Sequence, residues 1–146
     1  MKQPKRIFFW CTHNRCRSQL AASYTSFYAN NQVQVDSGGI DPRPIHPLTV
    51  QVLQEEHVAC HEESGKLLNM ISFVDSDVII ILCDETREAC PVIPFGLDYR
   101  VWPITDPLAT NNPTILAVRQ TRDEIKMYVR ELLNEYGLLS FDKGRV

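Results

Sequence analysis

A cysteine and an arginine six positions apart frame a short polar stretch near the start of the chain. Cys11 is followed by Arg17 and Ser18, with an apolar run at residues 7–10 before them and helix-forming residues at 19–24 after them. This order is typical of a loop that joins a strand to a helix. The backbone N–H groups of such a loop converge at the positive end of the helix dipole, where an oxyanion binds.

The same electrostatic field suits nucleophilic chemistry at the cysteine. It favours the thiolate, which is the reactive form of a cysteine side chain. A guanidinium such as that of Arg17 can hold two oxygens of an oxyanion at once. The loop at residues 11–18 is therefore suited to bind a tetrahedral oxyanion and attack it. From the spacing alone, a buried structural cysteine near a surface arginine explains the pattern equally well.

Two further cysteines enclose a polar segment in the middle of the chain. Cys83 ends an almost continuous β-branched run at residues 77–83, and Cys90 precedes Pro91. In a regular helix the two Cα atoms would lie about 10 Å apart, whereas a disulfide requires a separation below about 7 Å. A disulfide here needs the segment to unwind or loop out, which would make it a redox switch. Two unrelated cysteines fit the spacing equally well.

Strands and helices alternate along the chain, and their arrangement must position these residues. We expect strands at residues 6–10, 33–37, 77–83 and 99–103. We expect helices at residues 18–28, 47–58, 64–73 and 113–136. The alternation predicts an α/β fold with a parallel sheet covered on both faces. Ligands of such sheets bind beyond the carboxyl ends of the strands. We expect the tail after Leu139 to be mobile.

Length, charge and hydropathy narrow the possible partners and location. The 146 residues, 44% of them hydrophobic, predict one domain over residues 1–146. A net charge of −3 gives no bulk attraction to nucleic acid or to an anionic membrane. The apolar run at residues 78–83 is too short to cross a bilayer, and that at 7–10 is too short for a signal peptide. We therefore expect a cytoplasmic protein without nucleic-acid or membrane partners.

The number of cysteines points to chemistry rather than to structural cross-linking. Five cysteines are many for a reducing compartment, and an odd number does not fit a static disulfide framework. Cys60 lies near His57 and His61, which suggests zinc, but no fourth ligand stands at a recognisable spacing. We therefore expect no metal site.

The motif Cys-x5-Arg-Ser after the first strand resembles that of the low-molecular-weight tyrosine phosphatase family. The pair Cys83 and Cys90, followed by proline, is similar to the thioredoxin-coupled arsenate reductase branch of that family. The resemblance extends from about Arg6 to about Leu133. It implies a four-stranded parallel sheet of order 2-1-3-4 with helices on both faces. In that order Cys11 and Cys83 end neighbouring strands, about 4.8 Å apart, and a modest loop movement brings them within disulfide reach.

The resemblance also assigns roles to individual side chains. It makes Asp106 the acid that protonates a leaving oxygen, although an Asp-Pro pair alone is a common turn signal. It places Ser18 in hydrogen-bond contact with the nucleophilic thiolate. Asn14 and Ser37 match positions that brace the loop, and asparagine tolerates the left-handed backbone that such a loop requires.

The oxyanion-binding loop implied by the resemblance consists of Cys11, Thr12, His13, Asn14, Arg15, Cys16, Arg17 and Ser18. Two of its residues depart from the family. His13 replaces a usual glycine and can adopt a positive φ only at a cost. Arg15 replaces a small residue and either strengthens oxyanion attraction or is simply solvated. Cys16 either pairs reversibly with the nucleophile, which protects it, or is a small buried residue.

The resemblance implies a reductase that converts arsenate to arsenite through a Cys11–arsenic adduct. A thiol–disulfide relay through Cys83 and Cys90 would follow, and thioredoxin would reduce the final disulfide. Phosphate and sulfate would compete with arsenate, no cofactor is implied, and the default state is a monomer.

Two other functions stay open. A phosphatase would use the same loop and acid to hydrolyse phosphate esters through a phosphocysteine. Leu108 and Ala109 argue against an aromatic ester, because the family's phosphatases place aromatic residues after the Asp-Pro pair. A redox sensor or anion-binding regulator would keep the loop without turnover, and His13 and Arg15 would then be marks of drift.

Overall fold

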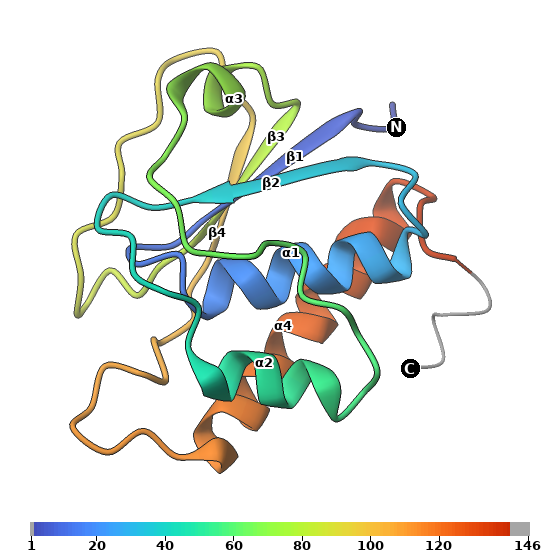
Figure 1. Cartoon of the computed structure of the whole chain (residues 1–146). Coiled ribbons are helices and arrows are strands. Elements are labelled where there is room, and N and C mark those ends of the chain that lie inside the picture. Colours follow the sequence, from blue (N-terminus) through green and yellow to red (C-terminus); the bar gives the residue numbers. More distant parts are fainter. Residues whose placement is uncertain (1, 141–146) are drawn as a thin grey trace.

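Four parallel strands form the central sheet in the computed structural model, which describes residues 2–140 (Figure 1). They are β1 Arg6–Trp10, β2 Gln34–Gly38, β3 Val78–Leu82 and β4 Tyr99–Trp102. Their order across the sheet is β2-β1-β3-β4, and all neighbouring pairs are parallel. The sheet order that the family resemblance implies is therefore confirmed. Each strand begins and ends within one residue of its expected bounds.

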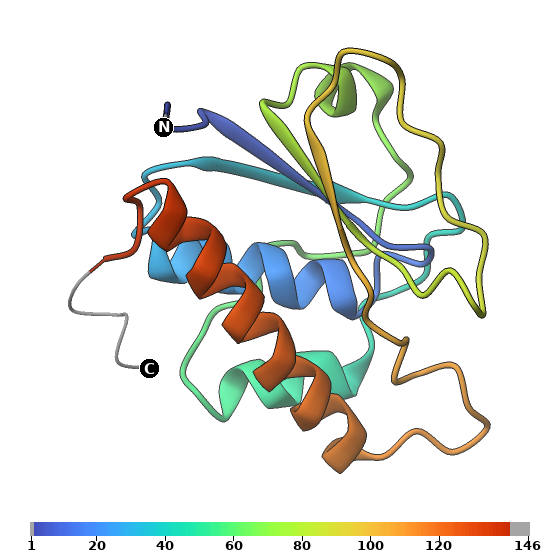
Figure 2. The same cartoon turned by 180° about the vertical axis from the view of Figure 1, so that it is seen from behind.

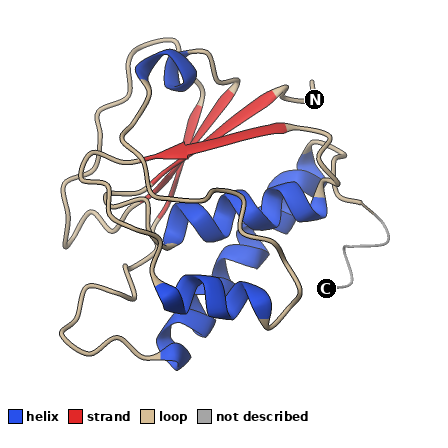
Figure 3. Ribbon diagram, viewed as in Figure 1, coloured by secondary structure: helices blue, strands red, loops and turns tan. Residues whose placement is uncertain are grey.

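Helices cover both faces of this sheet, as expected. They are α1 Arg17–Tyr28, α2 Pro47–Gln54, α3 Met70–Val74 and α4 Ile115–Glu135. Helices α1, α2 and α4 lie together on one face, and the short α3 lies on the other (Figures 1 and 3). Seen from behind, α4 crosses the same face as α1 and α2 (Figure 2). A long connection between β3 and β4 completes the cover of the α3 face.

The alternation of side chains along β1 divides the core into two parts. Ile7 and Phe9 pack in the cluster under α1 and α4, whereas Phe8 and Trp10 pack in the cluster on the opposite face. Successive side chains of a strand point to opposite faces, so a strand buried on both sides is apolar throughout. Phe73 of α3 meets Phe8 edge to face, with ring centroids 5.2 Å apart, and this contact holds α3 against the sheet.

The helix expected at residues 64–73 is mostly absent. Only its last part is helical, and the Asn69 side chain caps it by accepting hydrogen bonds from two backbone N–H groups at 3.0 and 3.2 Å. Residues 65–68 instead run beside the loop that follows β2. The Leu68 N–H donates to the Gly39 carbonyl at 2.8 Å, and the Gly39 N–H donates to the Lys66 carbonyl at 3.2 Å. These long-range bonds replace the local ones that a helix would make.

The helix that begins at Pro47 is shorter than expected. It ends at Gln54 rather than near Val58, because His57 adopts a left-handed backbone with φ +58°. The Val58 N–H then donates back to the Leu53 carbonyl at 3.1 Å. A left-handed residue that reverses the chain in this way is a common helix stop.

Two expectations concern the ends of the chain and its relation to membranes. Most of the tail expected to be mobile, residues 141–146, lies outside the described residues. Across residues 2–140, no helix is both long enough and apolar enough to span a bilayer.

Candidate active site

The loop between β1 and α1 holds Cys11 at the carboxyl end of the sheet. The Cys11 side chain is buried, and its Sγ lies 2.9 Å from the Ser18 hydroxyl. The Ser18 N–H donates to the same sulfur at 3.5 Å. Because α1 begins at Arg17, the positive end of its dipole also faces the loop. These are the contacts that a nucleophilic thiolate needs.

Asn14 is the brace of the loop. It is fully buried, and its backbone is left-handed with φ +49°. Its Nδ2 donates to the hydroxyls of Ser18 at 2.7 Å and Ser37 at 3.0 Å. Its Oδ1 accepts from the Lys66 N–H at 3.0 Å. One side chain thus ties together the loop, the end of β2 and the connection before α3.

His13 does not adopt the positive φ that its glycine-like position suggests. Within residues 2–140, the left-handed non-glycine residues are Asn14, Asn30, Asn31 and His57. Within the loop the left-handed residue is Asn14, a residue type that tolerates this backbone. The His13 ring instead faces Asp41, with Nδ1 2.9 Å from the Asp41 carbonyl oxygen and 3.1 Å from the carboxylate.

Arg17 is buried beneath the loop, and its guanidinium is hydrogen-bonded to a carboxylate. Both terminal nitrogens of Arg17 donate to the two oxygens of Glu88, with 3.0 Å between Nη2 and Oε2. The Thr12 hydroxyl donates to the same carboxylate at 2.7 Å, and the Asp84 N–H donates to it at 2.9 Å. Arg17 also donates to the Ile104 carbonyl at 2.9 Å. Burial alone would lower the pKa of Arg17, but the bond to Glu88 raises it above its usual value.

Glu88 is the residue of this site that the sequence motif does not reveal. It is part of neither the Cys-x5-Arg-Ser motif nor the cysteine pair, and glutamates in polar segments are mostly solvated. The only signal was its position between the two cysteines of the redox pair.

Cys83 and Cys90 form a disulfide, with 6.0 Å between their Cα atoms. The segment between them is a single turn in which the Asp84 carbonyl accepts from the N–H groups of Arg87 and Glu88, both at 3.0 Å. It is not a regular helix, as the distance argument requires. Cys83 packs in the cluster on the α3 face, whereas Cys11 packs in the cluster under α1 and α4.

Asp106 lies at the same end of the sheet and contacts the loop through Arg15. The Arg15 Nη2 atom is 3.6 Å from the Asp106 carboxylate and donates to the Leu108 carbonyl at 3.3 Å. The Leu108 N–H donates to Asp106 at 2.9 Å. Only 16% of the Arg15 side chain is exposed, so the alternative that Arg15 is simply solvated is wrong. Thr12, Glu88 and Asp106 line one cavity of about 510 Å³.

The remaining cysteines differ from Cys11 in their surroundings. Cys16 is a free thiol buried beneath the loop, and this burial raises its pKa to about 12. A neutral thiol at neutral pH suits a small buried residue better than an attacking group. Cys60 is a half-buried free thiol, and burial also raises its pKa. The neighbouring His61 ring contacts the Val35 carbonyl and the Ser26 hydroxyl.

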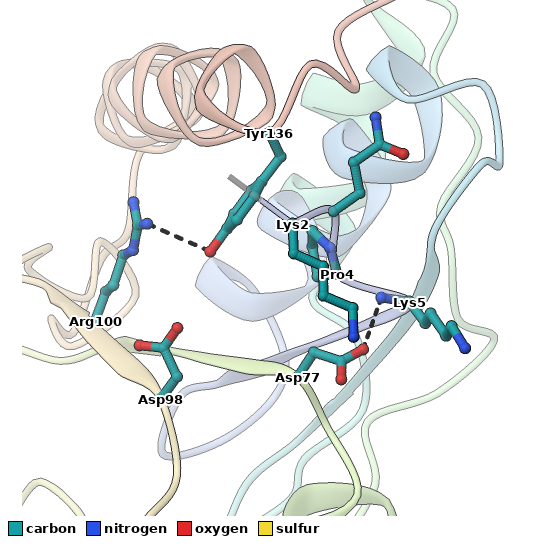
Figure 4. A pocket seen from close by; sticks show the side chains of 8 residues that line it. Lys2, Pro4, Lys5, Asp77, Asp98, Arg100 and Tyr136 are labelled. Carbon is teal, nitrogen blue, oxygen red and sulfur yellow. Dashed lines mark hydrogen bonds between the residues drawn. The ribbon is translucent and has the colours of Figure 1, made fainter.

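A second cavity of about 490 Å³ lies at the opposite end of the sheet (Figure 4). Lys5, Asp77 and Asp98, which line it, each directly precede a strand. Asp77 accepts from the Lys5 N–H at 2.6 Å. Arg100 points to the Tyr136 hydroxyl at 3.4 Å and pairs with a glutamate of α4 at 2.7 Å. The lining of this cavity contains no cysteine or serine, so the candidate active site is the one at the carboxyl end of the sheet.

Known proteins are similar to this chain over most of its length. Arsenate reductase 1 of Staphylococcus epidermidis is 29% identical over 124 residues, which cover 85% of this chain and 92% of that protein. The arsenate reductase of Brevibacillus brevis is 28% identical over 131 residues, covering 90% of this chain and 96% of that protein.

A solved structure is similar over most of the chain. The thioredoxin-dependent arsenate reductase of Corynebacterium glutamicum superposes with a TM-score of 0.73 at 30% identity, over 94% of this chain. The match spans 63% of that longer protein. A family model described as low molecular weight phosphotyrosine protein phosphatase matches residues 6–138. With the fold, the loop after β1 and a family match over nearly the whole chain in agreement, the chain belongs to the low molecular weight phosphotyrosine protein phosphatase family.

Proposed function

We propose that the protein reduces arsenate to arsenite and that thioredoxin restores its thiols. The observation that carries this proposal is the Cys83–Cys90 disulfide, which lies beside the oxyanion loop. A plain phosphatase cycle has no use for a second and third cysteine at this position. The names of the similar proteins, arsenate reductase and thioredoxin-dependent arsenate reductase, support the same activity.

The first step joins arsenic to sulfur. Arsenate binds to the loop N–H groups and to the Arg17 guanidinium, and the Cys11 thiolate attacks the arsenic atom. A sulfur–arsenic bond forms while an arsenic–oxygen bond breaks, and the oxygen leaves as water after Asp106 supplies a proton. The Ser18 hydroxyl, 2.9 Å from the sulfur, holds the thiolate in place before the attack.

The next steps move two electrons to arsenic. The Cys83 thiolate attacks the sulfur of Cys11, and the electron pair of the sulfur–arsenic bond stays on arsenic, which leaves as arsenite. The Cys90 thiolate then attacks Cys83 and releases the Cys11 thiolate. The two protein thiols are oxidised to one disulfide as arsenic(V) becomes arsenic(III). At the end of the relay Cys83 is bonded to Cys90 and no longer to Cys11. The packing of Cys83 on the face opposite Cys11 is consistent with that final state.

Regeneration requires a dithiol protein that can reach the disulfide. Cys83 is fully buried, whereas Cys90 is only half-buried, so an external thiolate reaches Cys90 more readily. Val92 and Phe95 stand exposed just beyond it and offer an apolar surface to thioredoxin. The cycle needs a compartment that keeps thiols reduced, so we place the protein in the cytoplasm. Phosphate and sulfate are the expected competing anions, and a monomer suffices for every step.

The test is arsenate-dependent oxidation of NADPH in the presence of thioredoxin and thioredoxin reductase. We expect steady turnover by the wild type and loss of at least 100-fold in Cys83→Ser and in Cys90→Ser, because either change interrupts the relay. Cys60→Ser is the matched control and should keep the wild-type rate. Continued turnover of Cys90→Ser with thioredoxin as the sole reductant would refute the three-cysteine relay.

Hydrolysis of phosphate esters is the second candidate, because the family is named for it and the loop and Asp106 serve both reactions. Leu108, which follows the Asp-Pro pair, is buried, so no aromatic ring stands there to hold a phosphotyrosine. A phosphate-ester assay separates the two functions. Ester turnover that exceeds arsenate turnover and is unchanged in Cys83→Ser would favour the phosphatase.

A further inference from the structure

The Glu88 carboxylate is held as a bound anion would be held. Its two oxygens receive hydrogen bonds from both terminal nitrogens of Arg17, from the Thr12 hydroxyl and from the Asp84 N–H. Only 18% of the Glu88 side chain and 2% of the Arg17 side chain are exposed. Arginine binds carboxylates and tetrahedral oxyanions with the same two-pronged geometry. A side chain of the protein therefore uses the group that the oxyanion needs.

Glu88 and an oxyanion cannot both use Arg17 in this way. The guanidinium presents a fixed fork of donors, and one of its terminal nitrogens also donates to the Ile104 carbonyl at 2.9 Å. The edge formed by the two terminal nitrogens is the one that Glu88 engages. An arriving oxyanion must displace this carboxylate before it binds that edge, and the negative charge of Glu88 so close to Arg17 disfavours a second anion there.

Glu88 stands in a loop that the disulfide closes covalently. Glu88 lies two residues before Cys90, in a loop that the Cys83–Cys90 bond closes at a Cα separation of 6.0 Å. The loop is anchored at Asp84, whose carboxylate accepts from the hydroxyls of Thr86 at 2.6 Å and of Thr105 at 3.0 Å. Opening the disulfide removes the restraint at the other end, so the turn that aims Glu88 at Arg17 is no longer enforced.

We propose that Glu88 is an internal competitor that occupies the oxyanion site while the Cys83–Cys90 disulfide is closed and leaves it when the disulfide is reduced. Reduction by a dithiol adds two electrons and two protons to the disulfide, the dithiol becomes a disulfide, and only an ion pair is broken at Glu88. Where arsenate is concerned the inference rests on the proposed function. Its consequence is that the oxidised protein, which lacks the thiols to finish a cycle, does not start one.

The ionisation of Glu88 is consistent with this role. Burial alone would raise the pKa of its carboxyl group, but hydrogen bonds from Arg17, from the Asp84 N–H and from Thr12 outweigh burial and lower it. The group is therefore a carboxylate at neutral pH, with the charge that an oxyanion also carries.

The experiment is calorimetric titration with inorganic phosphate, for the full chain in its oxidised and reduced states. Peptide mapping verifies that the oxidised sample carries the Cys83–Cys90 bond. We expect the oxidised wild type to bind phosphate at least tenfold more weakly than the reduced wild type. Glu88→Gln and Glu88→Ala should bring the oxidised affinity to within about twofold of the reduced one. Circular dichroism and a free-thiol count check that each variant is folded and oxidised.

Glu85→Gln is the matched control, because it removes the same charge from the same loop at an exposed position. It should keep the tenfold difference between the two states. Equal phosphate affinity of the oxidised and reduced wild type would overturn the proposal, as would weak binding that persists in both Glu88 variants.

The reductase assay on the same samples separates this inference from the proposed function. Arsenate-dependent NADPH oxidation together with equal affinities would refute the internal competitor and leave the reductase standing. A Glu88-dependent difference in phosphate affinity without arsenate-dependent oxidation would support the internal competitor and refute the reductase.

Discussion

At the scale of single residues, the active site depends on side chains whose hydrogen bonds cross between elements. Asn14 connects the loop to β2 and to the segment before α3, and Ser18 connects the start of α1 to the Cys11 sulfur. Each bond contributes about 1 kcal/mol, but a buried partner left unsatisfied costs more. We therefore expect Asn14 to affect the stability of the loop and Ser18 to affect the reactivity of the Cys11 thiol.

We expect Asn14→Ala to lower the free energy of unfolding by about 3 kcal/mol, because buried partners lose their bonds and alanine tolerates φ > 0 poorly. Urea unfolding of the reduced protein measures the change. Asn31→Ala is the control, since Asn31 shares the left-handed backbone at φ +60° but is exposed. It should lose only about 1 kcal/mol. Equal losses would mean that backbone conformation, and not the hydrogen-bond network, makes Asn14 important.

We expect Ser18→Ala to slow alkylation of Cys11 by iodoacetamide about tenfold at pH 7, which corresponds to about 1.4 kcal/mol for the lost contact to the sulfur. Mass spectrometry of the reduced protein follows Cys11 separately from the other thiols. Ser23→Ala changes a hydroxyl on the same helix whose contact is with the His61 N–H, so it should leave the rate unaltered. An unchanged rate in Ser18→Ala would remove Ser18 from the activation of Cys11.

At the scale of elements, the connection between α2 and α3 behaves as a strap across the end of β2. The Lys66 side chain pairs with Asp36 of β2, and the Lys66 N–H reaches Asn14. Burial would raise the pKa of Asp36, but bonds from Lys66 and Ser72 outweigh it and lower the pKa. Burial would lower the pKa of Lys66, yet the bond to Asp36 raises it. Each charge thus stabilises the other across the strap.

The strap should be sensitive to acid. Because the pKa of Asp36 is lower in the folded state, its stabilisation is complete above the unfolded value of about 3.9 and is lost as the pH falls through the folded value. We expect Asp36→Asn to be less stable than the wild type at pH 7 and to approach it at pH 3 in urea unfolding. Asp98→Asn, at an exposed aspartate, should track the wild type at both pH values. A gap that stays constant between pH 7 and pH 3 would contradict the ionic contribution of Asp36.

At the scale of the whole molecule, the strands could be predicted from the sequence because their pattern is local, whereas their order across the sheet came from the family resemblance. The apolar runs that become β1 and β3 are continuous and fully buried, and such runs mark strand bounds closely. The prediction of a helix at residues 64–73 was mostly wrong, because backbone groups of this segment form hydrogen bonds with Gly39 and Asn14. Those partners are distant in the sequence, so no local pattern reveals them.

The candidate site also contains residues whose placement is visible in the sequence and residues that only the fold brings together. The placement of Cys11, Arg17 and Ser18 in one loop between a strand and a helix could be predicted, because the apolar run before it and the helix formers after it are local signals. Glu88 could not, because its importance comes from the fold that brings it to Arg17 across 71 positions of sequence. The partnership of Arg15 with Asp106 is likewise a product of tertiary structure.

Cys11 and Cys83 pack in core clusters on opposite faces of the sheet, so the proposed relay connects the two halves of the core. In the proposed relay, oxidising equivalents pass from Cys11, in the cluster under α1 and α4, to Cys83, in the cluster on the α3 face. A reductant that acts on Cys90 would therefore approach from the α3 side of the sheet, next to the segment that carries Glu88.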